Sequence, residues 1–225
     1  MVREGSQTAR LLREMYDRLE RRFGDLCWWP AETPFEVIVG AILTQNTNWQ
    51  NVERAVANLR NENLLTEQGL LAVEEGRLAE LLRPSGYYRV KAKRLKAFIH
   101  FLFGEYRGDL GKMFAEDPRD LRVKLLGVKG IGEETADSIL LYAGGMPVFV
   151  VDAYTRRILS RHGIVDGDKS YGEIQRLFMD NLPADAPFYN QYHALLVQAG
   201  KLFCRKEPLC RDCPLRELEK ARSKS

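Results

Sequence analysis

The fold is decided by the stretch VKGIGEETA at residues 128–136. Two glycines, Gly130 and Gly132, stand there directly before a run of helix-forming residues. Because glycine has no Cβ, the backbone N–H groups of such a stretch can approach a phosphate group closely. Upstream, Pro118 follows an aspartate, which is typical of the first position of a helix. Residues 118–144 are therefore predicted to form a helix, a short glycine hairpin and a second helix.

Helices are predicted along the rest of the chain as well. Thr33 with Glu36, and Ser170 with Glu173, have the spacing of capping boxes at helix starts. The apolar run at residues 146–151 has no second segment with which to pair as a strand, so we expect a buried extended connection. The predicted fold class is all-α. The further helical patterns cover residues 8–23, 34–43, 52–59, 69–75, 78–82, 90–103, 153–161 and 186–203.

The charge balance indicates little by itself. The 225 residues include 34 Lys and Arg against 31 Asp and Glu, a net charge of +3, which is too near neutral to indicate a nucleic-acid partner. The run RVKAKRLK at residues 89–96 holds five cations and no acid, and predicts either a solvated helix face or a phosphate-binding patch. The longest apolar run, residues 37–43, is too short to cross a bilayer, and no secretory signal is recognisable. We expect an intracellular, cytoplasmic protein without a membrane partner.

Three of the four cysteines, Cys204, Cys210 and Cys213, are crowded within ten residues of sequence. In a reducing compartment this grouping indicates metal binding and not a disulfide framework. Cys27 is remote from them in sequence and is predicted to be a packed thiol.

The glycine hairpin is followed at a fixed distance by Val150, Val151 and Asp152. Together the hairpin and this segment resemble the helix-hairpin-helix superfamily of DNA glycosylases, the group that includes endonuclease III. The resemblance runs from about residue 35 to residue 213, which is most of the chain.

This resemblance implies two helical lobes with a DNA-binding cleft between them. One lobe would consist of residues 31–142, and the other of residues 1–30 with residues 143–225. The partner would be double-stranded DNA containing damaged bases, bound by a monomer associated with the nucleoid. Asp152 would be the catalytic residue, acting on a flipped nucleotide. The predicted DNA-binding residues are Gln45, Tyr87, Lys129, Gly130, Ile131 and Gly132.

Gln45 and Tyr87 match positions where the family inserts side chains into the duplex. Flipping a base costs stacking energy, and an amide and an aromatic ring offered from two loops would offset that loss. The alternative is that Gln45 caps its own helix and Tyr87 packs locally.

Glu134 marks a departure from the family pattern. Bifunctional members carry a lysine at this place, which attacks the sugar and forms a Schiff base that leads to strand cleavage. A carboxylate cannot form that imine, so the resemblance implies a monofunctional glycosylase without lyase activity. Glu133 and Glu134 are otherwise expected to complement the dipole of the helix that they begin.

Several segments resemble the monofunctional methylpurine (3-methyladenine) branch in particular: WWP at 28–30, GAILTQNT at 40–47, RPSGYY at 83–88, KAKRL at 91–95 and KGIGEETA at 129–136. By this resemblance the base pocket would consist of Trp28, Trp29, Pro30, Trp49 and Lys201. Indole faces suit a cationic, N-methylated purine. An ammonium group would repel such a base, so Lys201 is masked, modified, aimed at phosphate or structural, with the last two favoured.

Asp152 has two compatible roles. Aspartate is a favoured N-cap, and a helix is predicted to begin directly after it. Cleavage of the glycosidic bond develops positive charge on the deoxyribose, which a fixed carboxylate stabilises while it orients or deprotonates the attacking water.

The cysteine loop at residues 204–219 resembles the 4Fe–4S loop of this superfamily, but Glu219 stands where a fourth cysteine is expected. The open alternatives are a 4Fe–4S cluster completed by Glu219 or an outside ligand, a three-iron cluster, a zinc site, or no metal. In each case the loop would support DNA contact and take no part in cleavage.

Two rival functions remain for the sequence. One is a glycosylase for oxidised pyrimidines or mismatched thymine that uses the same Asp152. The other is a non-catalytic DNA-binding protein, degenerate at Glu134 and Glu219.

Overall fold

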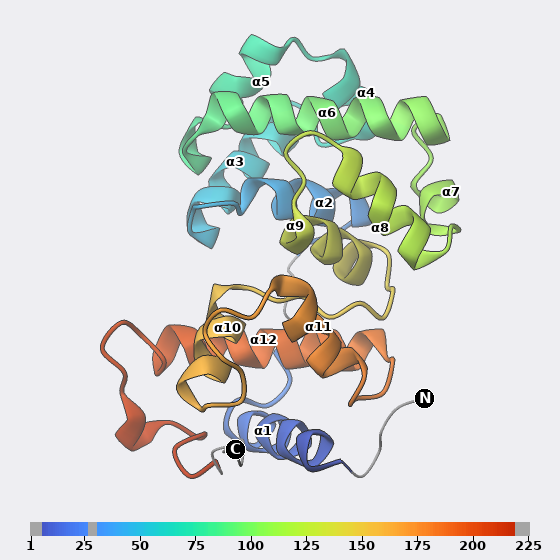
Figure 1. Cartoon of the computed structure of the whole chain (residues 1–225). Coiled ribbons are helices and arrows are strands. Elements are labelled where there is room, and N and C mark those ends of the chain that lie inside the picture. The colour runs from blue at the N-terminus through green and yellow to red at the C-terminus, as the bar shows by residue number, and fades with distance from the viewer. Residues whose placement is uncertain (1–5, 27–30, 219–225) are drawn as a thin grey trace. The chain divides into compact units, whose positions relative to one another are not determined.

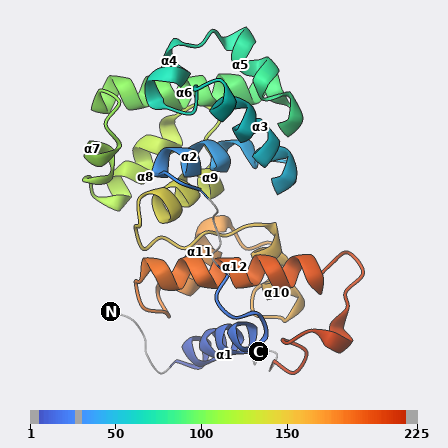
Figure 2. The same cartoon turned by 180° about the vertical axis from the view of Figure 1, so that it is seen from behind.

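The computed structural model describes residues 6–26 and 31–218. Within these ranges the regular structure is helical and no β-strand occurs, which confirms the all-α prediction for this part of the chain (Figures 1 and 2). None of the described helices combines the length and the apolar character that a bilayer span requires.

The chain divides into two compact units. We call Trp29–Gly145 the hairpin unit, and Met1–Trp28 with Met146–Ser225 the aspartate unit. The hairpin unit contains α2 (Pro34–Leu43), α3 (Trp49–Asn61), α4 (Glu67–Ala72), α5 (Glu75–Leu81), the 3₁₀ turn η1 (Arg83–Ser85), α6 (Tyr88–Tyr106), α7 (Leu110–Phe114), α8 (Pro118–Gly127), α9 (Glu133–Ser138) and the π-helical turn η2 (Ile139–Ala143). The aspartate unit contains α1 (Gln7–Phe23), α10 (Ala153–Arg161), α11 (Tyr171–Met179), α12 (Ala186–Leu202) and the 3₁₀ turn η3 (Cys210–Asp212).

Helix α2 is the core of the hairpin unit. Every residue from Phe35 to Leu43 is buried, and the helix packs against α3, α6, α9 and η2. Thr33 caps it, because its Oγ1 accepts a hydrogen bond from the N–H of Glu36 at 3.2 Å. The second half of the predicted capping box is absent: the Glu36 carboxylate accepts instead from Arg60 at 2.7 Å and from the N–H group of Glu32 at 3.2 Å. The Arg60 cation and a backbone N–H group together hold this nearly buried carboxylate.

The helix-hairpin-helix motif consists of α8, the turn that follows it, and α9 with η2. Asp117 caps α8 by accepting from the N–H of Arg119 at 2.8 Å, with Pro118 at the first helical position, as predicted. Leu121 and Leu125 are fully buried and anchor α8. The second helix changes to π-helical form at Ile139, which the sequence pattern did not predict.

The predicted helix at residues 69–75 is wrong in its bounds. Helix α4 begins earlier, at Glu67 after the cap Thr66, and the backbone is extended at Val73 before α5 begins. The cause is distant in sequence: the Lys96 ammonium on α6 donates to the carbonyls of Leu70 and Leu71, both at 2.9 Å, and to that of Val73. A cation that binds the last carbonyls of a helix stabilises its end there.

In the aspartate unit α1 and α10 both pack on α12 (Figure 1). Residues 146–151 form the predicted extended connection, with Phe149 fully buried. Phe149 stacks on Phe178 with ring centroids 3.8 Å apart, and Tyr189 and Tyr192 meet it edge-on. Gln175 donates to the Phe149 carbonyl at 2.8 Å, which fixes this connection on α11. The chain that leads to Asp152 is therefore held in place.

Candidate functional site

The hairpin presents backbone to solvent. Lys129, Gly130 and Gly132 are exposed, whereas Ile131 is 5% exposed and anchors the turn in the unit's core. Gly130 has φ +92°, and a Cβ there would come within 2.4 Å of the Arg94 side chain, so glycine is required on both counts. Gly132 is the N-cap of α9 and offers no side-chain cap. The first N–H groups of α9 consequently have no side-chain acceptor from the N-cap residue.

Gln45, in the turn after α2, is bonded to the hairpin. Its Nε2 donates to the Gly130 carbonyl at 3.2 Å and to Thr135 Oγ1 at 2.9 Å, and its Oε1 accepts from Arg94. In this structure the amide neither caps α2 nor points into solvent. It links α2, α6 and the hairpin.

Tyr87 lies in the turn between η1 and α6. Its side chain is 73% exposed, and its backbone is left-handed, with φ 45° and ψ 31°. A ring with this exposure is available to a partner. The alternative in which Tyr87 packs locally finds no support in this exposure.

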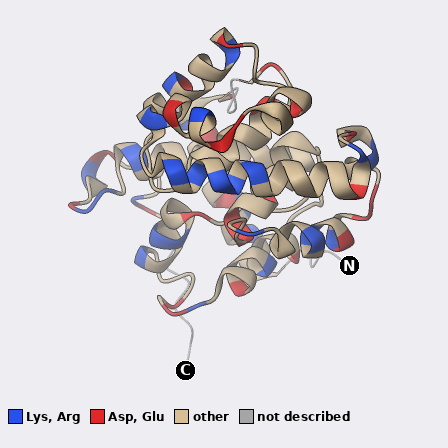
Figure 3. Cartoon of the chain, turned by 90° about the horizontal axis from the view of Figure 1, so that it is seen from above, with Lys and Arg blue, Asp and Glu red and all other residues tan. Residues whose placement is uncertain are grey.

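The basic run at residues 89–96 is neither a uniformly solvated face nor a uniform phosphate patch. Figure 3 shows these cations on the first half of α6. Lys91 donates to the carbonyl of Ser85, and Lys96 donates to carbonyls at the end of α4. Arg94 donates to the side chain of Gln45. Arg89 and Lys93 are the exposed members of the run. Three of the five cations therefore hold the unit together.

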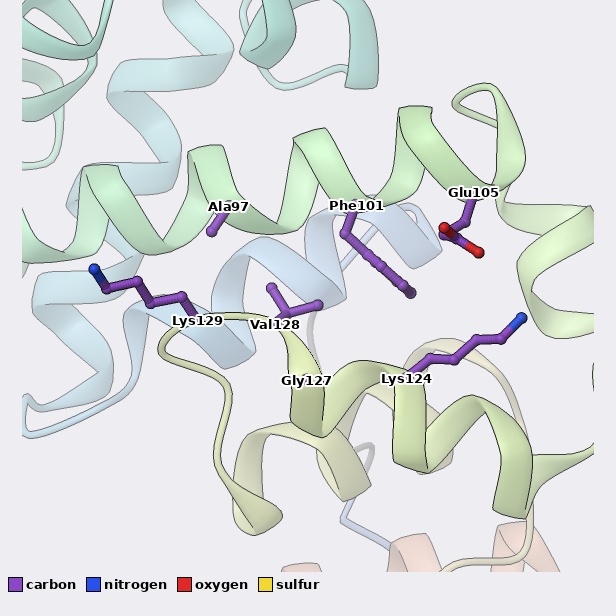
Figure 4. A pocket seen from close by; sticks show the side chains of 7 residues that line it. All are labelled: Ala97, Phe101, Glu105, Lys124, Gly127, Val128 and Lys129. Carbon is purple, nitrogen blue, oxygen red and sulfur yellow. The ribbon is translucent and has the colours of Figure 1, made fainter.

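A shallow pocket of about 460 Å³ lies between α6 and the first half of the motif (Figure 4). Phe101 and Val128 form its apolar floor, Lys129 lies at one end, and Glu105 and Lys124 lie at the other. It is lined by none of the residues predicted for the base pocket.

The predicted base pocket is only partly within the described residues. Trp28, Trp29 and Pro30 lie outside them. Trp49 begins α3 in the hairpin unit, is half-buried, and donates its indole N–H to Glu53 at 2.8 Å. Lys201 lies on the last turn of α12 in the aspartate unit and is exposed.

Asp152 is the N-cap of α10. Its Oδ1 accepts from the N–H of Thr155 at 2.7 Å, and its Oδ2 lies 3.7 Å from Nε2 of His193 on α12. The Asp152 side chain is 11% exposed and that of His193 is 7% exposed. Burial lowers the pKa of His193, opposed by the Asp152 charge, so the imidazole is neutral near pH 7.

His193 is a neighbour of Asp152 that the sequence pattern did not reveal. It stands in the middle of the mainly apolar helix α12, forty-one positions after the aspartate, and no motif spacing joins the two. The packing of α10 on α12 brings them together.

Residues 39–184 match the family model described as HhH-GPD superfamily base excision DNA repair protein. The chain belongs to this superfamily. A candidate DNA repair glycosylase of Methanocaldococcus jannaschii is 50% identical over 209 residues, which cover 92% of this chain and 94% of the relative.

Two solved structures extend the comparison. A complex of endonuclease III with DNA is similar with a TM-score of 0.80 and 26% identity, over 96% of each chain. The 3-methyladenine DNA glycosylase of H. pylori, solved with 1,N6-ethenoadenine bound, is similar with a TM-score of 0.71 and 27% identity, over 87% of this chain and 98% of that one. The chain is thus a DNA glycosylase of the HhH-GPD base excision DNA repair superfamily.

Within this HhH-GPD protein, Glu134 is exposed in the first turn of α9. The adjacent Glu133 lies 3.6 Å from Arg122. Arg122 in turn holds the fully buried Asp137 with two hydrogen bonds of 2.6 and 3.1 Å, which ties α8 to α9. Glu133 therefore has a structural partner as well as the expected place beside the helix dipole.

The three cysteines of the C-terminal loop influence one another. Burial raises the pKa of the Cys213 thiol, and the neighbouring Cys204 and Cys210 raise it further. Cys204 Sγ accepts from Arg161 at 3.3 Å. Among the described residues no three His, Cys, Asp or Glu side chains converge on one ion position. A 4Fe–4S cluster binds each thiolate to a different iron, so it does not require such convergence. Thiolate donors suit an iron–sulfur cluster and a zinc ion alike, and Glu219 lies outside the described residues.

Proposed function

We propose that this chain is a monofunctional DNA glycosylase that hydrolyses the N-glycosidic bond of alkylated purines of the 3-methyladenine type. The observation that carries the proposal is Asp152, a nearly buried carboxylate fixed by its own helix start, in a chain with Glu134 in place of the lyase lysine. We expect the protein to act as a monomer in the cytoplasm, on nucleoid DNA.

Asp152 would act on the sugar and on water. One carboxylate oxygen is committed to the Thr155 N–H group, which fixes the orientation of the other. As the glycosidic bond breaks, positive charge develops on the deoxyribose, and a fixed carboxylate stabilises that charge while it orients the attacking water. The neutral form of His193 beside it leaves the negative charge of Asp152 uncompensated from that side.

The preference for alkylated purines rests on the base. An N-methylated purine is cationic, so it leaves without much acid help and stacks well on electron-rich indole rings such as Trp49. The H. pylori relative, named for 3-methyladenine and solved with an ethenoadenine, supports a purine pocket. Lys201 would bind phosphate or support the fold, because its ammonium would repel a cationic base.

DNA would be held mainly by the hairpin unit. Lys129 and the backbone around Gly130 and Gly132 would bind phosphate, and Tyr87 would enter the duplex where the base leaves the stack. Gln45 could follow Tyr87 only after releasing its hydrogen bonds to the hairpin.

We also propose a 4Fe–4S cluster held by Cys204, Cys210 and Cys213, with Glu219 or an outside ligand at the fourth iron. The alternatives are zinc or no metal. Such a cluster would supply structure to a loop whose flanking cations, Arg205 and Lys206 among them, are exposed and would bind DNA phosphate.

The deciding experiment measures free base released by the purified protein from DNA methylated at purines, beside duplexes that carry an oxidised pyrimidine or a mismatched thymine. We expect methylated purines to be released fastest. A glycosylase for oxidised pyrimidines is the second candidate, and preferential release of that lesion would replace the proposal.

Borohydride added to the same reactions tests the monofunctional assignment. No covalent protein–DNA adduct is expected, since an imine requires an amine and Glu134 has none. If an adduct forms and Lys201→Ala abolishes it, Lys201 is a nucleophile and the protein is bifunctional.

A further inference from the structure

Lys91 carries a buried ammonium group inside the hairpin unit. It lies on α6, is 1% exposed, and donates from Nζ to the carbonyl of Ser85 at 2.6 Å. Burial, together with the nearby Arg94 charge, lowers the pKa of Lys91 to about 8. A buried ammonium is unfavourable unless a hydrogen-bond acceptor is fixed beside it. Lys91 and the Ser85 carbonyl therefore hold each other in one position.

That carbonyl lies at the base of the exposed turn. Ser85 ends η1, and Gly86 and Tyr87 follow with φ of 68° and 45°. A left-handed backbone is unfavourable for tyrosine and persists only where the surroundings fix it. The N–H group of Lys91 also donates to the Tyr87 carbonyl, at 3.0 Å. Lys91 thus binds a carbonyl on each side of Gly86, that of Ser85 through its side chain and that of Tyr87 through its backbone.

The residues that this turn exposes suit a duplex. Tyr87 is 73% exposed, and Val90, one helical turn away, is 46% exposed. Arg89 and Lys93 are exposed beside them on α6. An aromatic ring and an aliphatic side chain among cations are what an opened base step and its flanking phosphates accept.

We propose that Lys91 is the positioning residue that holds Tyr87 in its outward, left-handed conformation for insertion into DNA. The inference rests on the proposed function, in which Tyr87 enters the stack beside a flipped base. Lys91 is buried and does not touch the DNA. Its side chain acts on the turn through the Ser85 carbonyl, whereas the bond to the Tyr87 carbonyl comes from the backbone and persists in every variant.

Lys96 supplies a matched control on the same helix. It is half-buried, burial lowers its pKa, and its ammonium also donates to backbone carbonyls, those at the end of α4. Lys96→Met therefore removes the same chemical group from the same unit, at a turn that does not include Tyr87.

The experiment compares Lys91→Met, Lys96→Met, Tyr87→Ala and the double variant of Lys91 and Tyr87. A duplex carries 2-aminopurine beside an abasic analogue, and its fluorescence at saturating protein reports how far the stack is opened. The melting temperature of each variant is measured in parallel, and fluorescence is compared at a temperature where every variant is folded. Methionine matches lysine in length, and replacing a buried ion by an apolar side chain is often tolerated. Lys91→Arg, which keeps a cation for Ser85, serves if Lys91→Met does not fold.

We expect Lys91→Met and Tyr87→Ala to lose most of the fluorescence gain and about tenfold in base release, while Lys96→Met keeps both. The double variant should lose no more than Tyr87→Ala alone, because both changes remove one function. Lys91→Arg should retain more opening than Tyr87→Ala.

If Lys91→Met opens the DNA stack as far as the wild-type protein does, while Tyr87→Ala does not open it, the inference is overturned and the proposed function stays intact. Equal loss in Lys96→Met would also overturn it, since the effect would then be general to the unit. If Tyr87→Ala opens the DNA stack normally, the inference is overturned too, because Tyr87 then does not enter the duplex as proposed.

Discussion

The starts of α9 and α10 are two helix N-termini that differ in what faces their first N–H groups. The N-cap of α9 is the exposed Gly132, which offers no side-chain cap. The N-cap of α10 is Asp152, whose carboxylate accepts from the N–H group of Thr155 at 2.7 Å. The first N–H groups of a helix have no acceptor within the helix and carry partial positive charge, so an anion stabilises a helix start. The start of α9 can bind an anion from outside the chain, whereas the start of α10 already has the Asp152 carboxylate as its anion.

This difference separates two tasks between the units. In the proposed function the hairpin unit binds the phosphate backbone through α9, and the aspartate unit keeps its carboxylate for the sugar. Substitutions at the two starts should therefore affect binding and chemistry independently.

The largest effect is expected from Asp152→Asn. Asparagine caps a helix about as well as aspartate, so fold and DNA affinity should be retained, while base release falls by about a thousandfold because the charge is lost. Single-turnover release and DNA affinity are measured together. Asp185→Asn is the matched control, because Asp185 caps α12 in the same unit by accepting from Phe188 at 2.7 Å. Near-normal release by Asp152→Asn contradicts the assignment of the catalytic residue.

Gly132→Ala tests whether the start of α9 binds DNA phosphate. Its φ of −97° is allowed for alanine, and a Cβ there meets no atom within 4 Å, so the fold should be kept. The methyl group would stand where a phosphate approaches, and DNA affinity should fall about tenfold, or about 1.4 kcal/mol, with a smaller salt dependence.

Gly127→Ala is its control, since Gly127 is also exposed with no atom within 4 Å of an added Cβ. It should leave the affinity unchanged. Equal affinities for the two variants would show that the start of α9 does not bind DNA.

Trp49→Ala tests whether the hairpin unit contacts the damaged base as well as the DNA backbone. We expect excision of methylated purines to fall about fivefold, near 1 kcal/mol, with little change in affinity for an abasic site, because the indole face would stack on a cationic base. Trp49→Phe keeps a ring and should lose less. Equal losses on both ligands would make Trp49 a structural residue of α3.

The smallest effect on DNA is expected from Cys210→Ser in the aspartate unit. If the three thiolates hold an iron–sulfur cluster, the wild-type protein absorbs broadly at roughly 400 nm, and the variant loses this absorption and about twofold in DNA affinity. Release at saturating protein should not change. Cys27→Ser, remote in sequence, should keep the colour.

Either of two results from a metal analysis of the purified protein would contradict the cluster. Colourless protein with one zinc per chain would exclude it, and folded protein without metal would mean that the thiols bind none.

Local sequence patterns predicted where most helices start. The caps Asp117, Asp152 and Ser170 bond to backbone groups two or three residues ahead, and each begins a helix where expected. The hairpin between α8 and α9 was predictable for the same reason, because the left-handed backbone at Gly130 demands glycine. Interactions that close within one turn of chain can be identified from the sequence alone.

Tertiary structure decided which partner each polar side chain found. The run at residues 89–96 showed five cations, but only the packing of α6 assigned Lys91 to Ser85 and Lys96 to the end of α4. It likewise brought His193 to within 3.7 Å of Asp152. Helical periodicity indicates which face is buried and does not indicate what that face meets, since contacts between residues far apart in sequence depend on how the helices pack.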